Sequence, residues 1–449
     1  KHFHNVLCLS EAKGMDIIMK KCITTCMFIA ALAAALTGCS GSSSSNSESS
    51  AENTDVVTIR MAWWGGQARN EKFNEMLDAF EATHPNIKVE REPNSETAYV
   101  EKVTTQAAGQ NAPDVMQASS FYLDDFVARN LYMPLDDYVE SGKIDLSNFD
   151  GVDIKGGQKD GKQYIALWGH IITGIIYNET MFEEAGVAVP EMGWTWDDYV
   201  ETCTALQEKL PEGTWATEDE GGAYRNVESY AVQLGKSLFT EDSIELSEEE
   251  MINWYNDWAE LRKLGICPDA SIQKEQGNKN LEQSMFGRRK VAMYTTSCNQ
   301  LANFQSLTDD KLGIVNYPWI DGAVQETPMI ASGIGISANS KHPDEAAELI
   351  NWIINDEEAI KIFCGEHGQP ANKEARTIIE PLLTDAQKME YQYVEDMYSQ
   401  IIEYPVQAAG ANSIKTLLTT ENEAIAFGQM SVEDAVADFY QQASQILNR

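Results

Sequence analysis

Basic residues are scarce in this sequence. Its 449 residues include 33 Lys and Arg against 70 Asp and Glu, which gives a formal net charge of −37. Nucleic-acid binding needs clustered basic side chains that meet the phosphates, so this composition argues against a nucleic-acid partner. It also argues against charge-driven docking of the folded body onto anionic lipid. The acid excess is typical of a solvated, soluble surface.

Sequence motifs for catalysis and metal binding are also missing. There is no HExxH, GxSxG or GxGxxG segment, and the six histidines are scattered. We therefore predict no catalytic residue, no metal and no cofactor. With 70 acidic residues, pairs of carboxylates occur by number alone, so a secreted carbohydrate-active hydrolase stays open as an alternative.

Closely spaced cysteines are absent from the body of the chain. Four of the eight cysteines lie within the first 39 residues, and the others are Cys203, Cys267, Cys298 and Cys364. These four are far apart and form no CxxC pair, which excludes a zinc or redox pattern. Disulfides and buried free thiols both remain open for them.

The apolar run near the N-terminus is too short for a comfortable bilayer span. Residues 22–37 follow Lys20 and Lys21 and precede Gly38 and Cys39, whereas a spanning helix needs about 20 residues. The pattern predicts a secretory signal over 1–38, including residues upstream of the start, with a lipoprotein box that ends at Cys39. We expect a lipidated Cys39 and a Ser-rich tether over 39–54, which would anchor the body outside the cell membrane.

The body opens with a strand–helix–strand pattern. Residues 56–61 form a β-rich run, and Phe73, Met76, Leu77 and Phe80 follow at helical spacing on one apolar face. Residues 87–90 resume strand alternation. This order predicts an α/β fold with a largely parallel sheet, in which ligands sit beyond the carboxyl ends of the strands. The loop at 63–69 occupies that position after the first strand.

Several later helices are marked by their first turns. Ser247 and Glu250 have the spacing of a capping box, in which each residue satisfies a backbone N–H of the other. Further helix starts are predicted at Thr195, Pro343 and Ser431. No repeat of 20–50 residues is present, which excludes a solenoid.

Aromatic residues are abundant, with 10 Trp and 17 Tyr. An aromatic face with a polar rim matches a sugar ring, which has C–H faces and hydroxyl edges. Tryptophans in loops or at strand ends are candidate sugar platforms: Trp63, Trp64, Trp168 and Trp319. Tryptophans on predicted helices are expected to pack in the core: Trp196, Trp254, Trp258 and Trp352.

A series of short segments runs through the body in a defined order. They lie at 59–66, 80–85, 112–117, 161–164, 176–178, 194–198, 292–294, 333–336 and 341–347. Together, behind Cys39, they resemble the extracellular solute-binding proteins of ABC importers, the carbohydrate-binding group (family 1) that includes maltose-binding protein. The resemblance implies a two-lobed, periplasmic-binding-protein-like α/β fold with a ligand cleft between the lobes. It places the N-terminal lobe at 55–170 plus 330–375 and the C-terminal lobe at 171–329 plus 376–449.

The resemblance also implies a function and a set of ligand-binding positions. The protein would capture a mono- or oligosaccharide by hinge closure and deliver it to ABC permease subunits; a sugar sensor for a membrane receptor is an alternative. Besides the candidate platforms, the positions carried over are Arg69, Gln117, Ser119, Ser120, His170, Tyr294, Ser297 and Asn299. Arg69 would pair with the carboxylate of a uronic sugar, or else with a neighbouring acid such as Glu71.

Overall fold

The structure, a computed structural model, describes residues 56–447 apart from 241, 278–280 and 409. The expected signal, the lipidated Cys39 and the tether lie outside these described residues. Within them, no helix is both apolar enough and long enough to span a bilayer. The thiols of Cys203, Cys267, Cys298 and Cys364 are free.

The opening strand–helix–strand unit is present as predicted. Strand β1 (Val57–Trp64) leads through helix α2 (Gln67–Thr83) to strand β2 (Ile87–Asn94), and the two strands pair in parallel along their whole length. The predicted apolar face of α2 is fully buried, with Phe73 and Phe80 among its residues. Its burial against the sheet stabilises the helix, because each such side chain removes a large apolar area from water.

The main sheet is mixed rather than largely parallel. Strand β3 (Val115–Ser119) also runs parallel to β1, but β9 (Thr327–Ile336) pairs antiparallel with β3 and with β6 (Ile165–Asn178). The short strand β10 (Gln369–Pro370) is antiparallel to β6. The expectation of a largely parallel sheet is therefore wrong beyond the first three strands, because β6 and β9 run past each other in opposite directions.

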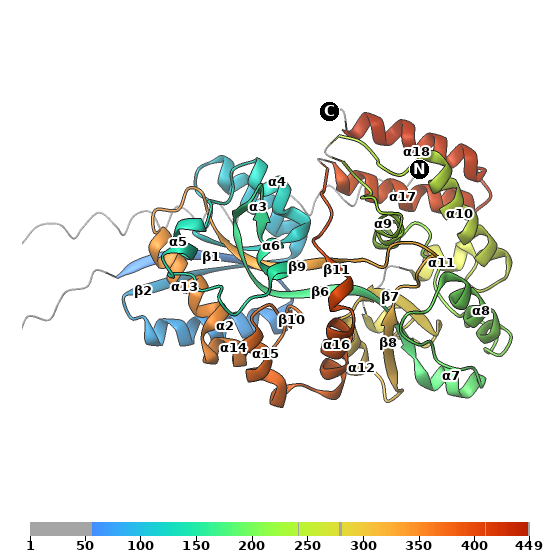
Figure 1. Ribbon diagram of the computed structural model, residues 1–449, viewed down its shortest axis with the longest axis horizontal. Helices are drawn as coiled ribbons and strands as arrows, with labels where there is room; N and C mark the ends of the chain where they lie inside the picture. Colours follow the sequence, from blue (N-terminus) through green and yellow to red (C-terminus); the bar gives the residue numbers. More distant parts are fainter. Residues whose placement is uncertain (1–55, 241, 278–280, 409, 448–449) are drawn as a thin grey trace, which may run out of the picture. The chain divides into compact units, whose positions relative to one another are not determined.

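Strand β6 belongs to two groups of strands. Its first part pairs with β9, and its later part pairs with β7 (Met293–Ser297) and β8 (Leu312–Asn316). Strand β11 (Ile401–Ile402) pairs in parallel with the start of β9. Three chain segments, in β6, β9 and around β11, therefore connect the two parts of the fold (Figure 1).

The N-terminal lobe places helices on both faces of β2–β1–β3. Helices α3 (Glu96–Ala108) and α4 (Ser120–Ala128) lie on one face, and α2, α13 (Pro343–Asn355) and α14 (Glu357–Phe363) lie on the other (Figure 1). The lobe also contains α5 (Asp136–Glu140), α6 (Gly151–Lys155), the hairpin of β4 (Gln158–Lys159) and β5 (Lys162–Gln163), and α15 (Lys373–Ile379).

The C-terminal lobe is mostly helical around β7 and β8. The predicted capping box at Ser247 forms before α10 (Glu248–Lys263), and the helix start predicted at Thr195 is confirmed by a capping box before α8 (Trp196–Gln207). The predicted start at Ser431 is confirmed, since its hydroxyl accepts from the N–H of Asp434 at 3.1 Å. The other helices are α7 (Glu179–Ala185), α9 (Tyr224–Gln233), α11 (Ala270–Gln276), α12 (Gln300–Gln305), α16 (Asp385–Asp396), α17 (Ala411–Ala426) and α18 (Val432–Leu447).

Two large hydrophobic cores define these lobes. The first contains Ile59, Phe73, Val115 and Ile350, from both faces of the β2–β1–β3 sheet. The second contains residues of α8, α9, α10, α17 and α18. Strands β6 and β9 supply side chains to the first core, and β6 also supplies Ile175 to the second. The chain thus has the mixed α/β, two-core organisation that the sequence predicts.

Candidate ligand-binding site at the lobe junction

An aromatic group lies where strands β1 and β3 end. Trp64 is the last residue of β1, and its N–H donates to the Oε1 of Gln117 on β3 at 2.9 Å. The Trp64 ring lies 4.9 Å from the ring of Tyr99 and 6.3 Å from that of Tyr122, centre to centre. Since β1 and β3 are parallel, both carboxyl ends meet at the edge where α/β sheets place their ligands.

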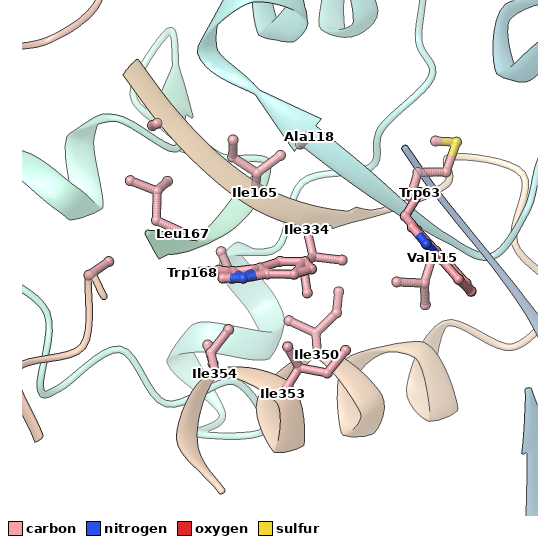
Figure 2. Close-up of a cluster of buried hydrophobic side chains, with 14 of the residues drawn as sticks. Trp63, Val115, Ala118, Ile165, Leu167, Trp168, Ile334, Ile350, Ile353 and Ile354 are labelled. Carbon is pink, nitrogen blue, oxygen red and sulfur yellow. The ribbon is translucent and has the colours of Figure 1, made fainter. Parts of the chain in front are cut away.

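The adjacent tryptophans on β1 have different neighbours. Successive side chains of a strand point to opposite faces, so Trp63 and Trp64 cannot share one side of the sheet. Trp63 is fully buried, stacks on Phe73 with ring centres 4.5 Å apart, and donates from Nε1 to the Oδ1 of Asn70 at 2.8 Å. It lies inside the first core, beside α13 (Figure 2). Trp64 is 9% exposed and also belongs to the first core, but it alone of the pair contacts the rings of Tyr99 and Tyr122.

The C-terminal lobe meets this edge with an arginine. Arg225, the second residue of α9, holds its guanidinium carbon 5.7 Å from the ring centre of Phe121 at the start of α4. Its Nη1 donates to the hydroxyl of Ser297 at the end of β7. Among the described residues, no carboxylate lies within ion-pair distance of Arg225. The two lobes therefore contact each other through a cation over an aromatic ring.

Further contacts join the lobes around Phe121. The Nζ of Lys415 lies 5.1 Å from the Phe121 ring centre and 4.2 Å from that of Tyr224. The Phe121 ring also meets Tyr404, from the segment after β11, at 4.9 Å. The N–H of Gln407 donates to Asp124 of α4 at 3.3 Å. Phe121 is thus surrounded by residues of the opposite lobe and of the connecting segment.

A buried carboxyl group is held by β7 and by Asn226, the residue that follows Arg225. Glu220 accepts from both the N–H and the hydroxyl of Thr295 on β7, at 3.0 and 2.5 Å, and from Asn226 at 3.2 Å. Burial nevertheless raises the pKa of Glu220 to about 8. Near neutral pH this side chain is therefore largely protonated and uncharged.

Arg69 has a partner within its own lobe. Its Nε lies 3.2 Å from the Oε1 of Glu366, whose other oxygen is 3.3 Å from the Nζ of Lys72. Burial lowers the pKa of His367 well below its usual value, and the positive charges of Arg69 and Lys72 lower it further. His367 is therefore neutral, and its Nε2 lies 3.3 Å from the Nε2 of Gln117. The ion pair of Arg69 involves Glu366 rather than Glu71.

Two predicted positions on β6 are packed inside the protein. Trp168 meets Phe73, Phe363 and His367 with ring centres about 5 Å apart, between the sheet and α13 (Figure 2). His170 is fully buried, with its Nδ1 2.7 Å from the Oδ1 of Asp153. Both side chains are enclosed by their own lobe in this structure.

The remaining predicted positions fall into two groups. Ser119 and Ser297 lie at strand ends beside the junction, at the start of α4 and beside Arg225. The other four make local contacts. The hydroxyl of Ser120 accepts from the N–H of Ala331, and Tyr294 packs against Phe286 and Phe304. Asn299 precedes α12, and the N–H of the buried Trp319 donates to the carbonyl of Trp194. The structure therefore places Trp64, Gln117, Ser119 and Ser297 around the junction. Arg69 lies close by, because its Nη1 donates to the carbonyl of Trp64 at 3.5 Å.

Comparison with known proteins assigns the family. The profile described as "Bacterial extracellular solute-binding protein" matches residues 64–360. This chain belongs to that family. A protein of Brucella abortus, whose name describes it as a binding protein, is 25% identical to this solute-binding protein over 339 residues, 72% of this chain and 78% of its own.

Solved structures share the fold of this solute-binding protein. A periplasmic oligogalacturonide-binding protein from Yersinia enterocolitica, in complex with saturated digalacturonic acid, has a TM-score of 0.74 at 23% identity and covers 88% of this chain and 99% of its own. An ABC substrate-binding protein from Listeria monocytogenes, in complex with cycloalternan, has a TM-score of 0.74 at 22% identity, covering 88% and 100%. The two-lobed α/β fold predicted from sequence is confirmed.

Several junction residues of the solute-binding protein were not predicted. Phe121 and Tyr122 directly follow the predicted Ser119 and Ser120, so the strand end itself was the available signal. Arg225 follows Gly221 and Gly222, and an aromatic–basic pair after two glycines at a helix start is a comparable signal. Pairing between β7 and α9 across 72 residues leaves no trace in the local sequence.

In the described residues, no cluster of His, Cys, Asp or Glu could hold a metal ion.

Proposed function

We propose that this solute-binding protein captures a sugar or oligosaccharide at the lobe junction and delivers it to the permease of an ABC transporter. The observation that carries the proposal is that Arg225 of one lobe lies over the ring of Phe121 of the other, and ring contacts connect Phe121 to Tyr122 and Trp64. Ring faces pack on the C–H face of a sugar, while hydroxyl, amide and guanidinium groups meet its edges. Relatives with this fold bind cycloalternan and digalacturonic acid.

Closure of the two lobes would capture the ligand. Three connecting segments, in β6, β9 and around β11, are the places where backbone rotation would swing one lobe towards the other. We propose lobe boundaries at 55–170 plus 330–375 and 171–329 plus 376–449. A ligand that touches both lobes favours the closed form only through its higher affinity for that form.

The ligand would carry a carboxylate, such as that of a uronic sugar. Arg225 is half-buried and has no carboxylate partner among the described residues, whereas Arg69 already pairs with Glu366. An acidic ligand would supply the missing partner for Arg225 and could form two parallel hydrogen bonds with it. The anion contact is therefore proposed for Arg225, with Ser297 beside it.

The location outside the membrane follows from the N-terminal segment. Cleavage after residue 38 would leave Cys39 for lipidation, and the tether at 39–54 would let the body reach a membrane-embedded permease. Metabolic labelling with an alkyne fatty acid tests this step. Label on the wild-type protein but not on Cys39→Ser supports the anchor, and equal labelling of both proteins refutes it.

Binding itself is tested by titrating purified protein with neutral and acidic saccharides. Calorimetry and thermal melting should identify at least one saccharide that raises the melting temperature, because saturation at a hundred times Kd adds about 2.7 kcal/mol of stability. A reducing-end assay run beside it should show no turnover. Lack of binding by every saccharide would refute the sugar proposal, and hydrolysis would favour a carbohydrate-active enzyme instead.

A further inference from the structure

A pocket opens in the C-terminal lobe at the end of α9 that lies away from the junction. Its lining includes Tyr230 and Gln233 from the last turn of α9, and its volume is about 290 Å³. Arg225 stands at the first turn of the same ten-residue helix. At 1.5 Å per residue the two ends are roughly 12 Å apart, so this pocket is separate from the proposed sugar site.

The floor of this α9 pocket is aromatic. Trp254 lies 5.1 Å from the ring centre of Tyr230 and 6.3 Å from that of Trp196. The Nε1 of Trp254 donates to the carbonyl of Gly221 at 2.7 Å, and the hydroxyl of Tyr230 donates to the carbonyl of Glu250 at 3.1 Å. With those polar atoms already bonded, these two residues offer the pocket ring surface rather than hydrogen bonds.

The rim of the α9 pocket is acidic. Asp197, Asp257 and Asp321 line it, and its lining contains no Lys, Arg or His. No ion pair or hydrogen bond of the Asp257 carboxylate is found among the described residues. Partial desolvation raises the pKa of Asp257. Burial raises the pKa of Tyr230 to about 12, and the negative charge of Asp257 contributes to this increase. The acidic rim therefore carries negative charge that no basic residue of the pocket lining neutralises.

One buried polar group in the α9 pocket has no partner. The hydroxyl of Tyr317, on a side chain only 7% exposed, makes no hydrogen bond in the described structure. Leaving a buried hydroxyl unsatisfied costs about 1–3 kcal/mol. Because this oxygen is enclosed by protein, it is not offered to a ligand in the pocket.

We propose that the α9 pocket binds a small organic ammonium ion. Aromatic faces attract a cation through their quadrupole, and quaternary ammonium groups are bound in this way between aromatic rings. The three aspartates supply the countercharge, and the rings meet the methyl groups. A neutral sugar would use the rings but leave the acidic charge uncompensated.

Choline and its uncharged carbon analogue, 3,3-dimethylbutan-1-ol, test the charge requirement with the full chain. Calorimetry should show choline binding at least about tenfold more tightly than the alcohol, in line with one strong cation–π and carboxylate contact. Asp257→Asn and Trp196→Leu should each weaken choline binding about tenfold.

Matched controls separate these effects from general damage. Asp385→Asn, at a fully exposed site on α16, should bind choline like wild type, and Asp321→Asn serves as a second rim variant if Asp257→Asn fails to fold. A saccharide bound at the junction should leave choline affinity unchanged. The proposal is overturned if choline does not bind, if the alcohol binds equally well, if both rim variants bind like wild type, or if saccharide competes with choline.

Discussion

The two lobes bring different chemistry to their junction. The N-terminal lobe contributes the rings of Trp64, Phe121 and Tyr122, and its cation Arg69 is neutralised by Glu366. The C-terminal lobe contributes Arg225, which has no carboxylate partner within the described part of the chain. One lobe thus offers an apolar platform and the other an uncompensated positive charge. A ligand that satisfies both has a C–H face and an anionic edge.

The difference follows from how each lobe is built. In the N-terminal lobe the junction residues sit at the ends of parallel strands, whose β-rich composition favours aromatic side chains. In the C-terminal lobe they sit at the start of α9 and the end of β7, where the guanidinium of Arg225 donates to the hydroxyl of Ser297. Rings therefore gather on one side and charges on the other.

The largest effect is expected from the two adjacent tryptophans. Trp63→Ala should lower the free energy of unfolding by about 3–5 kcal/mol, because it empties a fully packed core position. Trp64→Ala should instead lower saccharide affinity by roughly tenfold or more while destabilising the fold less. Urea unfolding and calorimetry measure both quantities. Equal loss of saccharide affinity in the two variants, with the fold intact, would remove the distinction between platform and core.

The second prediction compares the two arginines. Arg225→Gln should weaken binding of an acidic saccharide about tenfold and leave its neutral counterpart almost unchanged, since a charged hydrogen bond is lost. Arg69→Gln should have a smaller effect on the same pair, because Glu366 already occupies its guanidinium. Paired titrations with a uronic sugar and its methyl ester provide the measurement. A larger effect from Arg69 would assign the charge contact to the N-terminal lobe.

The third prediction concerns the buried acid of the C-terminal lobe. Glu220 has its pKa raised from 4.5 to about 8 in the folded protein, so between these pH values the folded state holds a proton that the unfolded state has released. Its contribution to stability is therefore lost as pH rises through this window. Glu220→Gln should flatten the fall in melting temperature between pH 5 and 8, by a few degrees. Glu249→Gln, at an exposed position on α10, should follow wild type, and identical profiles for wild type and Glu220→Gln would contradict the assignment.

The smallest effect is expected from the cysteines, which are shared between the lobes. All four described thiols are free, with Cys203 and Cys267 buried in the second core and Cys298 in the first. Dithiothreitol should therefore leave the melting temperature and saccharide affinity unchanged. A drop of several degrees on reduction would reveal a disulfide that stabilises the protein.

Local signals predicted most of the elements. The helix start at Thr195, the capping box at Ser247 and the apolar face of α2 depend on residues three or four positions apart, and each is found where it was expected. The direction of β9 was not predictable in this way. It pairs with β3 across more than 200 residues, and pairing over that distance depends on the path of the chain between the lobes.

The candidate site was predicted less completely than the fold. Strand alternation places Trp63 and Trp64 on opposite faces of the sheet, but it does not say which residues cover each face, and both tryptophans belong to the first core. Loop position marked Trp168 as a platform candidate, yet its surroundings depend on Phe363 and His367, nearly 200 residues later. Arg225 gains its importance from Phe121 and Ser297, which only the folded chain brings to it.

Hydrogen–deuterium exchange with and without a saturating saccharide tests the central claim most directly. Ligand held between the lobes should slow exchange on both sides at once, in peptides around 64–66 and 117–122 of one lobe and 220–226 and 295–298 of the other. The α9 pocket at Tyr230 and Tyr317 should keep its exchange rate. Protection confined to one lobe, or centred on that pocket, would contradict capture at the junction.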